Sequence, residues 1–162
     1  MSITDLLAEI QTLNALYCDA ESQSAKPGKS AGPVERLLCA DGSTWIEAPE
    51  DIQEFYQFGS PSSLCSVEQV WLSAAEMPDL LKNPNISELL CSDFDKGLLL
   101  FEPAKKNNSV LFAYDYLPSI FQRAYFVFPE PRSYFVLDAG SEIVRYENIE
   151  AYLTFWRDVV AD

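Results

Sequence analysis

The sequence predicts an α+β fold, an antiparallel β-meander flanked by N-terminal helices and a C-terminal helix. Apolar residues recur at helical spacing near both ends of the chain. Between residues 98 and 146, short β-type segments follow one another with tight turns between them. The chain has 162 residues, of which 48% are hydrophobic, so a single domain spanning 1–162 can bury a substantial core.

The first expected helix begins at Ile3, with Ser2 as its N-cap. Asp5 lies in the first turn, where a carboxylate complements the helix dipole. The apolar face repeats at helical spacing through Ile3, Leu6, Leu7, Ile10, Leu13 and Tyr17. Small and polar residues then fill 20–33, which we expect to be a flexible linker.

A β-hairpin and a short helix are expected next. Asp41-Gly42 is a strong hairpin turn signal between strand segments at 34–39 and 44–47. Pro49 then starts a helix that Gly59 ends. The inner face of this helix carries Ile52, Phe55 and Tyr56. Residues 67–72 have the composition of a strand.

Two further short helices are expected before the meander. Ser73 and Glu76 form a capping box for a helix that runs through Leu81, and 84–91 contains another helical turn or two. The expected strands that follow are 98–102, 109–114, 125–128, 134–137 and 142–146. Asn148 caps the closing helix, whose buried face is Ile149, Tyr152, Leu153, Trp156, Val159 and Val160.

The acidic residues are numerous and unevenly distributed. The formal net charge is −14 and the pI is about 4.2. Eleven acidic residues lie between Asp41 and Asp95, where Lys82 is the one basic residue. Such a field attracts basic partners, speeds their approach and repels nucleic acid and anionic membranes. The alternative interpretation is that the acidity serves solubility alone.

The chain lacks the residues and spacings that the commonest catalytic and metal-binding sites require. The chain has no histidine, and Cys18, Cys39, Cys65 and Cys91 include no CxxC pair. We therefore expect free, mostly buried thiols in a reducing cytoplasm, with no metal and no cofactor. Gly28-Lys29-Ser30 lacks the upstream glycine and the preceding strand of a phosphate-binding loop.

Carboxylates leave an enzyme open as a third interpretation. Asp93-Phe94-Asp95 has the spacing of a metal-binding DxD motif, but we interpret it as a polar turn. A glycosidase requires two carboxylates across a cleft, and the sequence singles out no such pair. The aromatic-rich segments 114–116 and 121–128 fit core packing, or a protein-binding surface. The expected class is a binding protein and not an enzyme.

Three segments resemble the SMI1/KNR4 (SUKH) superfamily. Ala48-Pro-Glu-Asp-Ile-Gln-Glu-Phe-Tyr56 is similar to the family's early "LPeDyrefY" helix, and 67–81 is similar to the strand and helix that follow it. Ile149-Glu-Ala-Tyr-Leu-Thr-Phe-Trp156 is similar to the closing "sFeeFL" helix. The resemblance spans roughly residues 45 to 160. It implies a bacterial immunity protein that neutralises a cognate toxin, in a family without shared catalytic residues.

The expected function is that of a cytoplasmic, acidic immunity-type protein that binds a cognate toxin and occludes it directly. It would make no direct contact with nucleic acid or membrane. The alternative is an acidic adaptor or regulator, including a nucleic-acid mimic, that occupies a basic groove of another protein. The sequence leaves the oligomeric state open. The expected partner-binding residues are Glu47, Glu50, Asp51, Glu54, Tyr56, Glu68, Trp71, Asp93 and Asp95.

Overall fold

One antiparallel sheet dominates the computed structural model, and the α+β class is confirmed. The structure describes residues 2–17, 34–58, 63–64, 69–72, 74–96, 103–115 and 122–161. The strand order β3-β4-β5-β6-β7-β8 follows the chain, as a meander requires. The strands are β3 (Ser63–Leu64), β4 (Gln69–Trp71), β5 (Ser109–Asp115), β6 (Arg123–Glu130), β7 (Ser133–Ala139) and β8 (Ile143–Tyr146).

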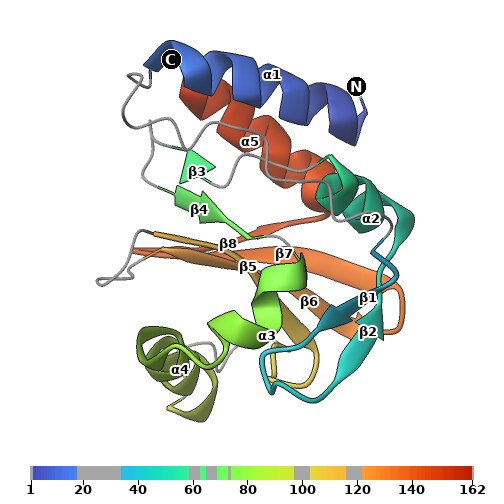
Figure 1. The fold of residues 1–162 in the computed structure, drawn as a ribbon, viewed down its shortest axis with the longest axis vertical. Helices are drawn as coiled ribbons and strands as arrows, with labels where there is room; N and C mark the ends of the chain where they lie inside the picture. Colours follow the sequence, from blue (N-terminus) through green and yellow to red (C-terminus); the bar gives the residue numbers. More distant parts are fainter. Residues whose placement is uncertain are drawn as a thin grey trace.

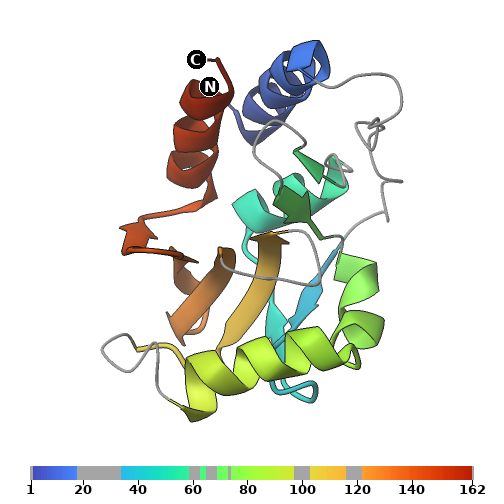
Figure 2. The ribbon, with the colours of Figure 1, turned by 90° about the vertical axis from the view of Figure 1, so that its left-hand side faces the viewer.

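Helices cover both faces of the sheet (Figures 1 and 2). On one face, α1 (Ile3–Tyr17) and α5 (Ile149–Ala161) lie side by side, next to α2 (Glu50–Gln57). On the opposite face lie α3 (Met77–Leu80) and α4 (Pro84–Leu90), which the chain inserts between β4 and β5. No helix among the described residues is long and apolar enough to cross a bilayer.

Local side-chain caps fix where the helices begin. The Ser2 hydroxyl accepts a hydrogen bond from the Asp5 N–H at 3.1 Å, at the start of α1. Asn148 Oδ1 accepts from the Ala151 N–H at 2.9 Å, at the start of α5. Both predicted caps are confirmed. Asn83 caps α4 in the same way, by accepting from the Asn85 N–H at 2.9 Å.

The expected hairpin is also present. Strands β1 (Arg36–Leu38) and β2 (Trp45–Glu47) pair antiparallel, with Leu37 opposite Ile46. Asp41 Oδ1 accepts from the N–H groups of Ser43 and Thr44, at 3.0 and 2.8 Å. Gly42 has a φ of +75°, which side-chain-bearing residues rarely adopt, so the glycine is needed at this point of the turn.

An aromatic core holds α2 and α5 on the sheet. Phe112 of β5 and Phe126 of β6 stack with ring centroids 4.0 Å apart. Phe55 of α2 and Tyr152 of α5 meet the Phe112 ring edge-on, at 5.9 and 5.2 Å. Edge-to-face and offset-stacked pairs are the favourable geometries for such rings. The position of α2 is therefore fixed relative to the sheet.

Three expectations about local structure need correction. Residues 74–76 form a 3-10 turn and α3 begins only at Met77, because Pro78 in its first turn favours a helix start there. Ser73, the other residue of the expected capping box, lies outside the described residues. The Asp93-Phe94-Asp95 segment is not a polar turn, since Cys91–Asp95 continues α4 with π-helical geometry. Val159 is 37% exposed because it lies beside the outer edge of β8, where the described sheet ends. The expected linker at 20–33 and the expected strand at 98–102 lie outside the described residues.

Candidate functional site

Four of the expected acidic residues meet on one surface. Glu47 of β2 and Glu50, Asp51 and Glu54 of α2 line a shallow groove of about 720 Å³, together with Pro49, Gln53 and Arg132. We call it the acidic groove. The chain leaves β2 at Glu47 and enters α2 three residues later, which brings these carboxylates together. Four carboxylates and one guanidinium give the groove a formal charge of −3.

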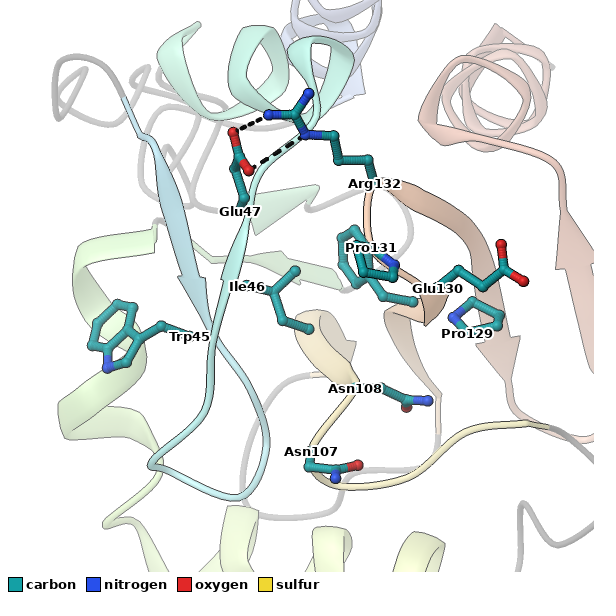
Figure 3. Close-up of a pocket in the computed structure, with 10 residues that line it drawn as sticks. Trp45, Ile46, Glu47, Asn107, Asn108, Pro129, Glu130, Pro131 and Arg132 are labelled. Atoms are coloured by element: carbon teal, nitrogen blue, oxygen red, sulfur yellow. Dashed lines mark hydrogen bonds and ion pairs between the residues drawn. The ribbon is translucent and has the colours of Figure 1, made fainter.

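An ion pair to the β6–β7 turn fixes Glu47. Arg132 Nη2 donates to Glu47 Oε1 at 2.6 Å, and Arg132 Nε donates to Oε2 at 3.3 Å (Figure 3). Both side chains are largely exposed, at 61% for Glu47 and 71% for Arg132. Solvent therefore screens the pair, and its contribution to stability is small. Its consequence is geometric, because it joins the hairpin to the β6–β7 turn.

Two further carboxylates are also held by hydrogen bonds. Asp51 accepts from the Tyr134 hydroxyl, and also from the Ile52 N–H at 2.9 Å. Burial, followed by this bond to Asp51, raises the pKa of Tyr134, so its hydroxyl stays a donor. Glu54 accepts from the Thr4 hydroxyl at 2.9 Å and from the Thr4 N–H at 3.1 Å. The Glu50 side chain is exposed and makes no hydrogen bond with the described residues.

The backbone at Arg132 is unusual. Its φ is +63°, and among the described residues it is the only non-glycine residue with a positive φ. Proline followed by a residue with positive φ is the pattern of a type II turn, which prefers glycine or asparagine at the second position. Arginine costs about 1–2 kcal/mol there. The pairing of Glu130 with Ser133 fixes this two-residue turn.

A second groove, of about 300 Å³, lies on the other side of the Glu47–Arg132 ion pair (Figure 3). Ile46 projects from β2 into it, facing Pro131 across the groove. Buried Phe128 and exposed Pro129 complete its apolar walls, so we call it the apolar groove.

Asn107 and Asn108 close the end of the apolar groove away from the ion pair. Asn108 is rigidly held, since its Oδ1 accepts from the Lys105 N–H at 2.8 Å and its Nδ2 donates to the Pro103 carbonyl at 3.0 Å. The Asn107 amide is exposed and has no hydrogen-bond partner in the described part of the chain.

Trp45 is the surface residue that sequence reasoning missed. It is 54% exposed and is among the residues that line the apolar groove, and its ring lies on the other side of β2 from the Ile46 side chain (Figure 3). Side chains alternate along a strand, so a half-buried Ile46 places Trp45 and Glu47 together on the exposed face of β2. This alternation in 45–47 was the available signal.

Two expected aromatic anchors lie in the core instead. Tyr56 is 6% exposed and Trp71 is 2% exposed. Tyr56 lies on the inner face of α2, 5.1 Å from Phe55 between ring centroids. Trp71 packs against Phe55 and Tyr152, at 6.0 and 6.3 Å. Neither ring is available to a partner. Glu68 lies outside the described residues.

Asp93 and Asp95 line neither groove and lie on the segment that follows α4. Asp93 is 1% exposed, and its carboxylate accepts from Arg123 Nε at 2.9 Å, from Arg123 Nη2 and from the Tyr125 hydroxyl. Burial, reinforced by the Asp93 charge, holds the pKa of Tyr125 well above its usual range. Asp95 is exposed, and its hydrogen bond from Lys106 Nζ, at 2.7 Å, holds its pKa below its usual value.

The described residues contain no group of three or more histidine, cysteine, aspartate or glutamate side chains that could hold a metal ion. No protein-family model, curated protein or solved structure matches the chain.

Proposed function

We propose that the chain is an acidic immunity-type protein that binds a basic surface of a cognate toxin and occludes it directly. The observation that carries this proposal is the acidic groove, in which four carboxylates from adjacent elements face one surface. A local formal charge of −3 on a chain of −14 attracts a basic partner from a distance and orients it on approach.

The carboxylates are pre-positioned for binding. Arg132, Tyr134 and Thr4 already fix three of them, so a partner would not have to order these side chains. Ordering a long side chain at an interface costs about 0.5–1.5 kcal/mol, and fixed carboxylates avoid most of that cost. Each carboxylate retains acceptor capacity for a lysine or arginine of the partner.

Trp45 supplies an apolar contact beside the acidic residues. Tryptophan is enriched among the residues that dominate interface energies, and this one is exposed on β2 next to the hairpin end that carries Glu47. Charge would then govern the rate of association, while burial of the indole ring would govern the lifetime of the complex.

The partner can be identified by affinity purification from the native cell, followed by identification of the protein that co-purifies. Association and dissociation rates are then measured with Glu50→Lys. Glu150→Lys is the matched control, because it reverses an exposed glutamate in the first turn of α5. We expect Glu50→Lys to slow association several-fold at low salt, with the difference shrinking as salt rises, and Glu150→Lys to have a much smaller effect.

An association rate insensitive both to Glu50→Lys and to salt would overturn this proposal for the acidic groove. Recovery of a host protein in place of a toxin would favour the adaptor or nucleic-acid-mimic alternative.

A further inference from the structure

The acidic and apolar grooves lie next to each other, and we call the two together the track. Both are lined by Glu47 and Arg132, and the ion pair between these residues is the boundary that they share (Figure 3). One end of the track is closed by Asn107 and Asn108, and the other end runs along the first two turns of α2. The track therefore has an apolar half and an anionic half.

Each half fits a different kind of side chain. The apolar half presents Ile46, Phe128, Pro129 and Pro131, with a volume of about 300 Å³, at the lower end of the range for ligand pockets. The anionic half offers carboxylates and no apolar side chain except Pro49. A ligand that satisfies both halves must carry an apolar group next to a cationic group.

Building on the proposed function, we propose that this track docks an extended segment of the partner protein. A proline or aliphatic side chain of the segment occupies the apolar groove, and an arginine or lysine close by in the same segment occupies the acidic groove. Charge complementarity selects this occupant, because the carboxylates of the track favour a basic segment, and a second copy of a chain with net charge −14 would be repelled. Extended segments leave their backbone groups free, and the Asn107 amide can donate to one of their carbonyls.

Short fluorescein-labelled peptides test this proposal by fluorescence anisotropy. One set carries a single arginine and a single leucine or proline, separated by one, two or three serines. A second set has serine in place of the apolar residue. We expect the best apolar-plus-basic peptide to bind about tenfold more tightly than its basic-only counterpart, because one apolar side chain becomes buried.

The variant that tests the apolar half is Ile46→Thr, which keeps a β-branched side chain in β2 but makes the groove wall polar. Ile143→Thr is the matched control, since Ile143 is an exposed isoleucine in another strand, β8. We expect Ile46→Thr to remove most of the tenfold gain and Ile143→Thr to preserve it. Salt gives a second measurement without any substitution: basic-only binding should weaken as salt rises, while the gain from the apolar residue should persist.

The outcomes separate the two proposals. If both peptide sets bind with equal affinity at every spacing, or if the gain survives in a folded Ile46→Thr variant, the docking track is overturned and the acidic groove stands. If Glu50→Lys leaves the affinity of the basic-only set unchanged, the proposed function fails at this site. If the protein self-associates and the peptides disrupt that association, the occupant of the track is a second copy of the chain. That result would overturn the proposal of a partner segment.

Discussion

At the scale of single residues, the most consequential side chain outside the grooves is Asp93. Its carboxylate is buried with Arg123, whose side chain is 11% exposed, and with the Tyr125 hydroxyl. A buried charge whose partner is removed must be desolvated without compensation, which is far more costly than losing an exposed pair such as Glu47–Arg132. The pair fastens the segment after α4 to the sheet.

We expect Asp93→Ala to lower the free energy of unfolding by about 3 kcal/mol, because it leaves the Arg123 guanidinium buried without its carboxylate. The double variant Asp93→Leu/Arg123→Met should be less destabilised than the single variant, since it removes the guanidinium together with the carboxylate that binds it. Urea denaturation of both proteins measures the difference. A double variant less stable than Asp93→Ala would contradict this account.

Above about pH 9, the Cys39 thiol makes the free energy of unfolding depend on pH. Burial, with a smaller contribution from the Asp41 charge, raises its pKa from 9.0 to about 12. Between these values the folded protein holds a proton that the unfolded chain releases, so the free energy of unfolding falls as pH rises, by up to about 1.4 kcal/mol per pH unit. We expect the fall between pH 9 and 11 to be shallower in Cys39→Ala. Parallel stability curves for the two proteins would rule out this contribution.

At the scale of elements, the sequence patterns that gave correct predictions involve residues close together in the chain. The caps at Ser2 and Asn148 and the Asp41-Gly42 turn each act within four residues, so the sequence alone was sufficient to predict them. The exposure of Trp71 and Asp93 depends instead on which helices cover which face of the sheet. Trp71 is enclosed by α2 and α5, and Asp93 by β6, and no local pattern encodes either contact.

The acidic groove likewise combines residues that are close in the sequence with a contact that depends on the tertiary fold. Glu47, Glu50, Asp51 and Glu54 are close in the sequence, and all four were predicted as partner-binding residues. Their apposition to Arg132 was not predictable, because it depends on the register that places the β6–β7 turn beside the hairpin.

The β6–β7 turn carries a prediction of its own. We expect Arg132→Gly to be more stable than Arg132→Ala by about 1 kcal/mol, because both variants lose the contact with Glu47 and only glycine adopts a φ of +63° without strain. Thermal and urea unfolding of the two variants make the comparison. Equal stabilities would mean that the backbone at this position relaxes at little cost.

At the scale of the whole molecule, 25 acidic residues oppose 11 basic residues on one compact chain. Mutual repulsion among them destabilises the folded state, and salt screens that repulsion over about 10 Å at 0.1 M. We expect Tm to rise by a few degrees between roughly 20 and 200 mM NaCl. Differential scanning calorimetry measures the shift, and a fall in Tm would show that attractive ion pairs outweigh the repulsion.

The packing of α1 against α5 constrains when the protein can fold during its synthesis. Leu6, Leu7 and Ile10 of α1 are buried, and Glu9 lies 3.9 Å from Arg157 of α5, near the far end of the described chain. Contacts so distant in sequence cannot form until α5 has left the ribosome, on the order of ten seconds after α1 has emerged at ordinary rates of translation. Throughout that interval the apolar face of α1 lacks α5, its main helical partner. The contact between α1 and α5 is therefore among the last of the described contacts to form as the chain is synthesised.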